Sequence, residues 1–522
     1  MRSYTVEAIC AIPHPVPTHC LAASACMTHL LTGSQDGYVR DYDIFAAVNG
    51  KVFLTAPQRH HCGVMEGLMK GGQIRCWWEN PLEVPNPGAE DVSLSPVYSL
   101  AMHSDALWAL AGSDQGNVNL YTVRHDPGRL IHIMKGHRGS VSGLALQHDE
   151  MGYFSAGWDG DAIQWDLNTG QMVRKFTAHG SQLTSIGVRP LVSHHEGHWS
   201  SPPRTAANLY PHDPGMPQSD SNFAYANPPE YQAQQAPNAQ HVQPQLYPMP
   251  NAQDDDIKSE TSYDPLFDEP DADGEPDADD NPPPTVLHQS NLSQPAPPPL
   301  QSSHPSVSFP TAQSTARSAV APKGAPPVLD PLTYMTFSPD VIMTASIDGQ
   351  IILWDVRVHA QGTGVGRLWM SEKTPPWCMS ACWSADGAQI YAGRRNGTVE
   401  IYDVRQTGRA ASGTPKILKT LRNPVSSGVV SCVVAFPDGR HLACASHDNI
   451  RLWNVAEAGE PEVSGRIKSG VQFKIIPGHH GGFISQMLVD PAARFLVTAS
   501  SNRGWHGEST RTIFVHEVKH LR

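Results

Sequence analysis

The stretch GHRGSVSGLALQHDEMGYFSAGWDGDAIQWDLNTG, residues Gly136–Gly170, decides the fold of this chain. It contains three short runs of alternating apolar residues, Val141–Leu146, Tyr153–Ala156 and Ala162–Trp165. A Gly-His pair precedes the first run, and a Trp-Asp-Gly turn separates the last two. Period-two alternation interrupted by turn residues is typical of short antiparallel strands. The stretch therefore predicts a small antiparallel sheet.

The rest of the chain repeats this unit with substitutions. Successive copies end at residues 43, 121, 166, 355, 403, 454 and 517. Gly-His at the head and Trp-Asp at the tail are typical of a WD-repeat blade, which spans about 40 to 50 residues. Most spacings fall near that length once one long interruption is set aside. The sequence predicts an all-β fold, a seven-bladed WD-repeat β-propeller.

A strand-like run at Tyr4–Ile12 precedes the first unit, which begins near Thr18, and it belongs to no complete copy. An open ring would expose sheet edges and leave the two end blades unpacked. We therefore expect this N-terminal run to form the outer strand of the last blade and to close the ring.

One interruption divides the repeats. Leu191–Pro327 holds 26 of the 46 prolines together with Gln-, Asn- and Ser-rich tracts. Proline blocks the hydrogen bonds of a sheet, and so few large apolar residues cannot offset the entropy lost on ordering a chain. We expect a disordered insertion in blade four. It separates residues 1–190 (blades one to three and the start of blade four) from residues 328–522 (the rest of blade four and blades five to seven).

The insertion also carries the negative charge of the chain. It has 17 acidic and 4 basic side chains, which accounts for the whole net charge of −13. Its segment Asp254–Asp280 has 13 acidic residues and one lysine, interrupted by Tyr263, Leu266 and Phe267. This pattern indicates either a solvated linker or a segment that binds a basic surface. The remaining chain is neutral, which gives no support for direct nucleic-acid binding, since that function usually leaves a basic footprint.

Two units are less regular. In blade four, Leu183–Pro190 before the insertion and Leu332–Ser338 after it both fit the innermost strand, and the sequence does not decide between them. In blade one, Lys51–Ala56 is the predicted outer strand, whereas Pro57–Pro81 matches no strand of the repeat. The second stretch is therefore predicted to be an elaboration of blade one.

An aspartate recurs six residues before the closing aromatic residue, as at Asp159 and Trp165. This spacing puts the carboxylate in a tight turn and the indole on the next strand, where His137 can bridge Asp159 and the Ser155 hydroxyl. A Ser-His-Asp set also serves nucleophilic hydrolases. Here similar sets recur in several units, whereas catalysis needs one. We predict that these four residues form a structural network and that the chain is not an enzyme.

Residues that depart from the repeat are better candidates for binding partners. The stretch Pro57–Pro81 supplies six of them: Arg59, His60, His61, Arg75, Trp77 and Trp78. Tryptophan and arginine are enriched in interface hot spots, although the same side chains also fit a well-packed elaboration of a blade.

Metal and cofactor chemistry finds little support in the sequence. The pair His60-His61 lacks Cys or acidic partners at ligand spacing, and the cluster His194, His195 and His198 begins the predicted disordered tract. The nine cysteines are scattered, which indicates a reducing compartment. No glycine-rich nucleotide motif and no apolar stretch of about 20 residues occurs. We expect no cofactor, no metal and no membrane contact.

Three stretches carry more than the general repeat pattern: TVEAICAIPHPVP (Thr5–Pro17), MTHLLTGSQDGYVRDYDIFAAVNGK (Met27–Lys51) and LTAPQRHHCGVMEGLMKGGQIRCWWENP (Leu54–Pro81). They closely resemble the TATA-binding-protein-interacting, WD-repeat subunits of the fungal SAGA transcription coactivator complex, of the suppressor-of-Ty class. The resemblance continues through SIDGQIILWDVR (Ser346–Arg357) and is most specific at Gln58–Pro81.

The resemblance implies a nuclear, non-enzymatic scaffold. Such a subunit would bind TATA-binding protein and other subunits of a SAGA-type complex, and would regulate delivery of TATA-binding protein to promoters of RNA polymerase II. Proteins of this class commonly have a long acidic N-terminal extension, whereas this chain begins almost at its first strand. Any role of that extension is then absent or moves to Asp254–Asp280. A substrate receptor of a ubiquitin ligase or a histone-tail reader is the alternative, because a fold does not locate a site.

Overall fold

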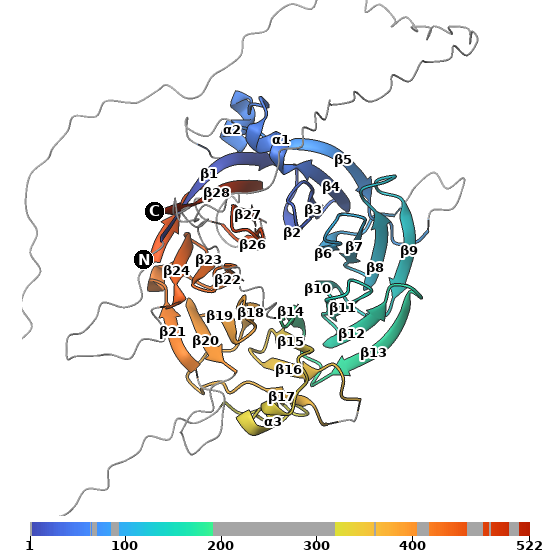
Figure 1. Ribbon diagram of the computed structural model, residues 1–522, viewed down its shortest axis with the longest axis vertical. Helices are drawn as coiled ribbons and strands as arrows, with labels where there is room; N and C mark the ends of the chain where they lie inside the picture. Colours follow the sequence, from blue (N-terminus) through green and yellow to red (C-terminus); the bar gives the residue numbers. More distant parts are fainter. Residues whose placement is uncertain are drawn as a thin grey trace, which may run out of the picture. The chain divides into compact units, whose positions relative to one another are not determined.

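The described residues form a propeller of seven four-stranded antiparallel sheets arranged as a ring (Figure 1). The computed structural model describes residues 3–62, 64, 70–84, 93–191, 319–359, 362–404, 417–456, 473–479, 482–500 and 511–521. Each sheet is one blade, with its first strand at the central channel and its last strand at the rim. The predicted all-β, seven-bladed architecture is confirmed.

From the channel outward, the strands of the first four blades have the following bounds. Blade one contains β2 (Thr18–Ala23), β3 (Leu30–Ser34), β4 (Tyr38–Asp43) and β5 (Gln73–Glu79). Blade two contains β6 (Val97–Met102), β7 (Trp108–Ser113), β8 (Asn117–Thr122) and β9 (Leu130–Lys135). Blade three contains β10 (Val141–Leu146), β11 (Gly152–Gly157), β12 (Asp161–Asp166) and β13 (Gln171–Thr177). Blade four contains β14 (Leu183–Val188), β15 (Val341–Ser346), β16 (Ile351–Asp355) and β17 (Val365–Arg367).

The remaining blades follow the same order, except that the last one includes the N-terminal strand. Blade five contains β18 (Cys378–Trp383), β19 (Gln389–Arg394), β20 (Thr398–Asp403) and β21 (Ile417–Arg422). Blade six contains β22 (Val430–Ala435), β23 (His441–Ser446), β24 (Ile450–Asn454) and β25 (Phe473–Ile476). Blade seven contains β26 (Ile484–Val489), β27 (Phe495–Ser500), β28 (Thr512–Leu521) and β1 (Ser3–Pro13). The helical elements are α1 (Ile44–Asn49), α2 (Ala56–Cys62), α3 (Pro331–Met335) and the 3-10 turn Val425–Ser427.

The N-terminal strand closes the ring. Strand β1 pairs antiparallel with β28 from Ser3 opposite Leu521 to Pro13 opposite Thr512, so the two chain ends lie side by side (Figure 1). Its Val6 packs in the core shared with blade six, and its Ile12 packs in the core shared with blade one. The expected role of the N-terminal run is therefore confirmed.

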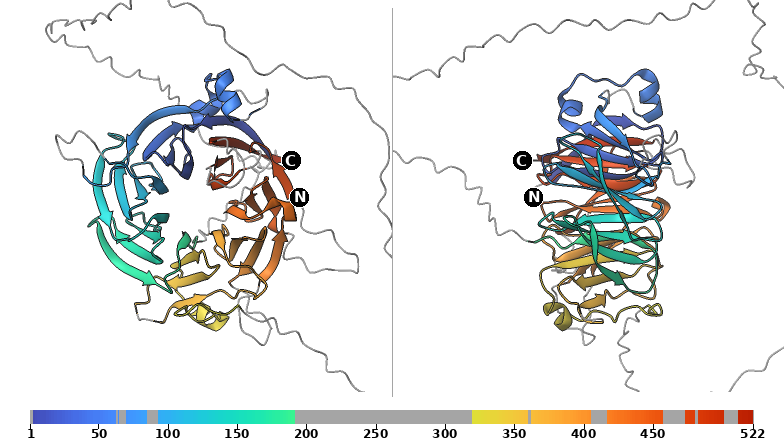
Figure 2. Two further views of the ribbon diagram at one scale, coloured as in Figure 1. Left: turned by 180° about the vertical axis from the view of Figure 1, so that it is seen from behind. Right: turned by 90° about the vertical axis from the view of Figure 1, so that its right-hand side faces the viewer.

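The hydrophobic core is divided among the junctions between blades. Seven clusters of buried residues among the described ones each join two neighbouring blades, including the junction of blade seven with blade one. A twisted sheet has two faces, and each blade buries both by packing on its neighbours around the ring (Figure 2). Burial of apolar side chains thus stabilises the ring as a whole as well as each blade.

Each innermost strand bulges near its start. In all seven, the register with the second strand shifts by one residue: at His19, Tyr98, Ser142, Thr184, Met379, Ser431 and Ser485. A bulge leaves one residue outside the hydrogen-bond ladder and re-aims its side chain. These seven residues therefore form a ring of their own near one end of the channel.

Blade four takes its innermost strand from before the insertion. Strand β14 pairs antiparallel with β15, with Leu183 opposite Ser346. The competing run Leu332–Ser338 begins inside helix α3 instead. Pro331 occupies the first turn of that helix, and the Asp330 carboxylate accepts the backbone N–H of Thr333 (2.9 Å) as its N-cap. The expected insertion falls between β14 and β15, and its segment Asp254–Asp280 lies outside the described residues. Its predicted end at Pro327 is wrong: residues 319–327 are ordered against blade four, where Arg367 donates to the backbone oxygens of Pro326 and Pro327 (both 3.0 Å).

The outer strand of blade one differs from the prediction. Lys51–Ala56 was the expected strand, but it forms only one isolated bridge, between Phe53 and Lys70, before α2 begins. Strand β5, inside the stretch Pro57–Pro81, takes that place. Outer strands pair on one edge only, and most side chains of β5 are exposed, so the alternation that marks inner strands is weak there.

Candidate partner-binding sites

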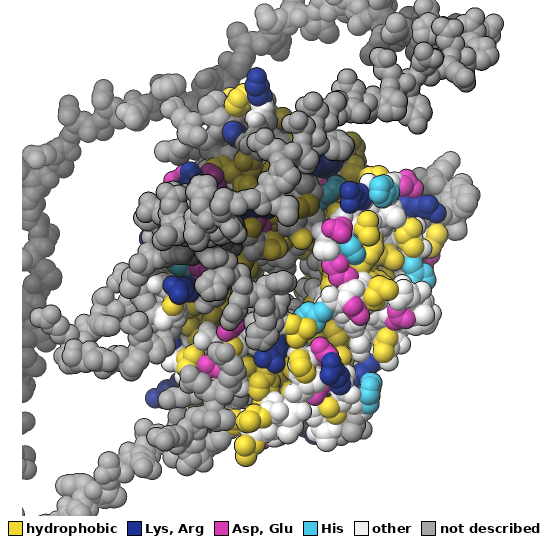
Figure 3. All heavy atoms as spheres, in the orientation of Figure 1, with side chains coloured by type: hydrophobic (Ala, Val, Ile, Leu, Met, Phe, Trp, Pro, Cys, Tyr) yellow, Lys and Arg dark blue, Asp and Glu magenta, His cyan; other side chains and the backbone are white. Residues whose placement is uncertain are grey.

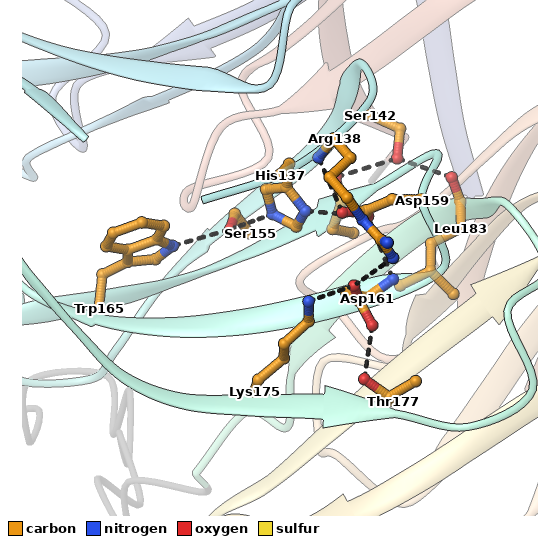
Figure 4. Close-up of polar contacts among 11 residues, drawn as sticks. His137, Arg138, Ser142, Ser155, Asp159, Asp161, Trp165, Lys175, Thr177 and Leu183 are labelled. Carbon is orange, nitrogen blue, oxygen red and sulfur yellow. Dashed lines mark hydrogen bonds and ion pairs between the residues drawn. The ribbon is translucent and has the colours of Figure 1, made fainter. Parts of the chain in front are cut away.

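One chain of hydrogen bonds connects the loop before blade three with its strands (Figure 4). The indole N–H of Trp165 on β12 donates to Ser155 Oγ on β11 (2.9 Å). His137 Nε2 lies 2.7 Å from the same hydroxyl, and His137 Nδ1 lies 3.0 Å from Asp159 Oδ1. A carboxylate only accepts, so Nδ1 carries the proton and Nε2 accepts from Ser155. All four predicted network residues are in contact.

The carboxylate of Asp159 stays ionised. Burial opposes its charge, but hydrogen bonds from the His137 ring and from the Arg138 backbone N–H (3.0 Å) outweigh burial and lower the pKa of Asp159 to about 2. The Ser155 side chain is fully buried between His137 and Trp165. A nucleophile needs space for a substrate above its oxygen. This network therefore holds the loop that contains His137 against blade three. It leaves no space for a substrate at the Ser155 hydroxyl.

Other blades have polar contacts in the corresponding region, but different residues form them. In blade four, His179 Nε2 lies 2.6 Å from Asp348 Oδ2, and the Trp354 indole donates to a threonine hydroxyl on β15 (3.0 Å). In blade five, a buried Arg394 pairs with Glu400 instead (2.7 Å). Repetition with substitution is what a scaffold requires, because each blade needs its polar groups satisfied and the identity of those groups is secondary.

Three candidate residues lie on α2, which stands outside the ring against β1 (Figure 2). His61 Nε2 lies 3.2 Å from the backbone oxygen of His14, just after β1, and so joins the helix to the closing strand. Arg59 donates to the backbone oxygen of Leu54 (3.5 Å) and is half-buried. The imidazoles of His60 and His61 are exposed. Helix α2 therefore presents two histidines to solvent.

The other three candidates lie on β5 and differ in exposure. Trp78 is 7% exposed and packs on Tyr121 of blade two, with ring centroids 5.9 Å apart. Trp77 points the other way, as alternation along a strand requires, and is 62% exposed. Arg75 forms an ion pair with Asp43 and donates to a backbone oxygen in the turn between β2 and β3 (3.2 Å). Trp78 is a core residue, and of the two indoles Trp77 is the accessible one.

Trp77 borders a groove of about 510 Å³ between blades one and two. Its walls include Tyr38, Glu79 and Tyr121, so aromatic surface surrounds one carboxylate. The Tyr38 hydroxyl donates to Glu79 Oε1 (3.3 Å). The six candidates thus occupy three places: helix α2, this groove, and the ion pair of Arg75. The structure does not gather them into a single pocket.

A second cavity, which the sequence did not indicate, lies in the central channel. It has a volume of about 340 Å³ and is lined by residues of all seven innermost strands. His19 stacks on Tyr98 (centroids 4.8 Å apart), and Tyr98 meets Trp158 edge to face (5.5 Å). His19 and Tyr98 are bulge residues of different blades, so they come together only in the closed ring. Trp158 belongs to the Trp-Asp-Gly turn of the repeat, so the sequence did not indicate that it lines a cavity.

The surface mixes charges of both signs. On the face shown in Figure 3, acidic, basic and histidine side chains are interspersed with apolar ones over blades two and three. Within the described ranges, no three His, Cys, Asp or Glu side chains lie close enough to hold a metal ion. No helix in that part of the chain is long and apolar enough to span a membrane. His194, His195 and His198 lie outside the described residues.

Seven fastened blades around a channel, with grooves at the blade junctions, define a WD-repeat β-propeller scaffold. The sequence profile of the SPT8 beta propeller family matches residues 4–201 and 326–519. The chain belongs to this family, whose members are non-enzymatic propellers. The predicted resemblance and the prediction that the chain is not an enzyme are therefore confirmed.

Two relatives are similar over nearly the whole chain. The chain is 31% identical over 529 residues to SAGA complex subunit SPT8 of Saccharomyces cerevisiae, covering 99% of this chain and 73% of that protein. It is 31% identical over 516 residues to SAGA complex subunit Spt8 of Schizosaccharomyces pombe, covering 99% and 79%. A solved structure, that of U3-55K, has a TM-score of 0.51 over 98% of both chains at 11% identity, which shows the shared fold alone.

Proposed function

We propose that this chain is a nuclear, SAGA-type transcription coactivator subunit that binds TATA-binding protein and other subunits and regulates delivery of TATA-binding protein to promoters. The observation that carries the proposal is the 31% identity to two SAGA complex subunits over 99% of the chain, which includes all seven blades. A rigid ring with several separate surfaces suits a subunit that must hold more than one partner at fixed positions.

For TATA-binding protein we favour the groove beside Trp77. An exposed indole next to a concave, partly aromatic surface has the composition of an interface hot spot. Arg75 extends this surface along β5, where its ion pair with Asp43 leaves its side chain 37% exposed. Arg59, His60 and His61 on α2 would form a second contact. Trp78 supports the groove from beneath.

The test measures binding of purified TATA-binding protein to the full chain. Truncating a hot-spot residue costs about 2 kcal/mol or more, so Trp77→Ser should raise Kd by at least about tenfold. Val173→Ser is the matched control, because Val173 is 55% exposed on the outermost strand of blade three. Unchanged binding by folded Trp77→Ser protein would remove this groove from the proposal. Absence of binding by the unsubstituted chain would refute the contact altogether.

Membership of a coactivator complex is tested separately, by affinity purification of the tagged full chain from nuclear extract of its own cells. Co-purifying acetyltransferase-complex subunits would support the proposal. Adaptors of a ubiquitin ligase in their place would refute it.

Removing residues 192–318, which leaves the residues that hydrogen-bond to blade four in place, and repeating both assays assigns the role of the insertion. We expect complex assembly to persist, because the seven blades remain. Loss of TATA-binding-protein capture alone would move that contact from the Trp77 groove to the insertion.

A further inference from the structure

The groove beside Trp77 combines aromatic surface with a single charged side chain. Among the described residues that line it, four are aromatic, one is acidic and none is basic. The aromatic ones are Tyr38, Trp77, Trp78 and Tyr121, and the acidic one is Glu79. The face of an aromatic ring has a negative potential and attracts cations, as a carboxylate also does. The composition of this groove therefore favours a positively charged group.

Strand β5 places Trp77 and Glu79 on the same face. The two residues are two positions apart, so their side chains point the same way and their Cα atoms lie about 7 Å apart. Both side chains are exposed, and within the described ranges no ring or cation contacts the Trp77 indole. One cation can therefore lie within about 6 Å of the indole centroid and within about 4 Å of the carboxylate at the same time.

The carboxylate of Glu79 is held in place but is not neutralised. Tyr38 lies directly opposite on β4, and its hydroxyl donates to Glu79 Oε1 (3.3 Å). The Tyr121 hydroxyl donates to the backbone oxygen of Glu79 (3.1 Å) and so fixes the end of the strand. In the part of the chain that the structure describes, Glu79 has no ion pair, and its charge raises the pKa of Tyr38. Oε2 is therefore open to a donor from a ligand.

The other charges near the groove do not compensate Glu79. Three arginines lie close by and each has an aspartate partner: Arg40 with Asp36, Arg75 with Asp43, and Arg129 with Asp126. Arg124 and His125, in the same turn of blade two as Arg129, do not line the groove. The exposed Glu83 follows β5, and the connecting stretch 85–92 contains two acidic residues and no basic one. The charge that remains here is negative.

Tyr38 shows that a cation already uses this surface. The guanidinium of Arg40 lies over the Tyr38 ring, 5.4 Å from its centroid, while it pairs with Asp36 (2.5 Å). A basic side chain of this chain thus combines an aromatic face with a carboxylate one strand inward. Trp77 and Glu79 offer the same combination at the rim, where the described residues leave it unoccupied.

The floor of the groove offers a hydrogen-bond donor. Trp78 is 7% exposed, and its indole N–H has no acceptor within the described residues. The turn of blade two packs closely on this indole, since a Cβ added at Gly128 would lie 2.6 Å from the Cβ of Trp78. Buried donors are normally satisfied. An oxygen atom of a segment that enters the groove can supply the missing acceptor.

We propose that the Trp77 groove accepts a lysine or arginine side chain of the bound partner, which places its cationic group on the Trp77 indole and pairs with Glu79. This inference rests on the proposed contact of TATA-binding protein with the groove and adds the chemistry of the group that enters it. Tyr38 positions the Glu79 carboxylate, and the Trp78 N–H donates to a backbone oxygen of the partner. The groove then selects a cationic segment over an apolar one.

The first test changes the charge of Glu79 in the full chain and measures binding of purified TATA-binding protein. Glu79→Gln keeps the size of the side chain and should raise Kd at least about threefold. Glu79→Lys brings like charges together and should raise Kd at least about tenfold. The matched controls are Glu372→Gln and Glu372→Lys, at an exposed glutamate between β17 and β18. Equal effects at the two positions would reflect net charge alone and would overturn the proposal.

Salt distinguishes an ion pair from an apolar contact. Between about 50 and about 400 mM KCl, Kd should rise more steeply for the unsubstituted chain than for Glu79→Gln, because salt screens a pair that the variant lacks. Glu372→Gln should keep the slope of the unsubstituted chain. The same slope for the unsubstituted chain and Glu79→Gln would overturn the pairing of Glu79 with a cation.

Two replacements of Trp77 test the role of its ring. Trp77→Phe keeps an aromatic face for the cation, whereas Trp77→Leu keeps only apolar bulk. The leucine variant should bind TATA-binding protein at least about threefold more weakly than the phenylalanine variant. Equal Kd values for the two variants would show an apolar contact and would overturn the cationic side chain.

This inference and the proposed function fail in different ways. If TATA-binding protein does not bind the unsubstituted chain, or binds folded Trp77→Ser normally, the contact at the groove is refuted and this inference with it. If Trp77→Ser weakens binding but Glu79→Lys does not, the contact stands and the cationic side chain is overturned. Because Trp77 and Glu79 are exposed, each variant should unfold at the temperature of the unsubstituted chain, which shows that the ring is intact.

Discussion

Within blade three, single side chains connect the loop and the strands through hydrogen bonds. Asp159→Ala removes the acceptor of both the His137 ring and the Arg138 backbone N–H and leaves the buried N–H of the His137 ring unsatisfied. The expected loss is about 1–3 kcal/mol of unfolding free energy, measured by urea denaturation. The exposed Asp105 provides the control, since Asp105→Ala should change stability by less than about 0.5 kcal/mol. Similar values for both variants would show that the network does not stabilise the blade.

Two buried histidines make stability depend on pH. Burial lowers the pKa of His14 to about 4 and that of His516 to about 3. In the unfolded chain a histidine titrates near about 6.5, so below that pH the unfolded state binds protons that the folded state does not. Stability is therefore full above about pH 6.5 and falls as the pH drops toward 4.

The measurement is the urea midpoint of the chain between about pH 7.5 and 4.5. His516→Gln should reduce the slope below pH 6.5, because one of the two protonation sites is gone. His125→Gln, at an exposed position in the turn between β8 and β9, should leave the slope unchanged. A wild-type midpoint that stays constant down to pH 4.5 would contradict this origin of the pH dependence.

Among the strands, those that bury both faces are easier to predict from the sequence than those that bury one face. Strands β11 and β12 pack on both sides, and their alternation and turns identified a blade. Strand β5 lies at the rim with most side chains exposed, so its sequence QIRCWWE has no alternation of apolar and polar residues. The sequence therefore predicted the outer strand of blade one at Lys51–Ala56 instead. The run after the insertion has a strand-like composition, but Asp330 and Pro331 start a helix there. The N-cap at Asp330 and the proline in the first helical turn thus determine the secondary structure of this run, which its apolar pattern did not predict.

The candidate sites were less predictable than the fold. Trp77 and Trp78 are identical in type and adjacent in sequence, and only the direction of each side chain from β5 makes one core and the other surface. The channel cavity depends on residues from seven separate strands. Periodicity within a unit carries no information about contacts between units, so neither feature was accessible from the sequence alone.

Strand β1 should be the element on which the ring depends most. It supplies the outer strand of blade seven and buries side chains against blades six and one. Removing residues 1–13 should therefore abolish cooperative thermal unfolding, a loss on the scale of a domain's whole stability, about 5 kcal/mol or more. Removing residues 1–2, which precede β1, is the control and should have little effect. A sharp transition at the original temperature after the longer truncation would show that the ring closes without β1.

At the scale of the whole molecule, closure makes the Trp77 groove and the channel cavity depend on the ring. The Trp77 groove lies at the junction of two blades, and the channel cavity uses all seven innermost strands. Each junction carries its own hydrophobic cluster, so the blades cannot shift independently without exposing apolar surface. A variant that disrupts the ring should therefore lose both partner binding and cooperative unfolding. A variant of a true contact residue should lose partner binding alone.

The insertion should be dispensable for this ring. Strands β14 and β15 pair directly, with Val188 opposite Ile342, so their register does not need residues 192–318. Residues 319–327 are kept, because Arg367 at the end of β17 donates to the backbone oxygens of Pro326 and Pro327 (both 3.0 Å). Joining Leu191 to Ala319 shortens the connection between these strands about sixfold, and each halving of a flexible loop returns about 0.6 kcal/mol of closure entropy. The shortened chain should then be as stable as the full one or more stable by up to about 1.5 kcal/mol, measured by urea denaturation of both proteins side by side. A loss of stability would mean that the removed residues pack on the propeller and are not a disordered insertion.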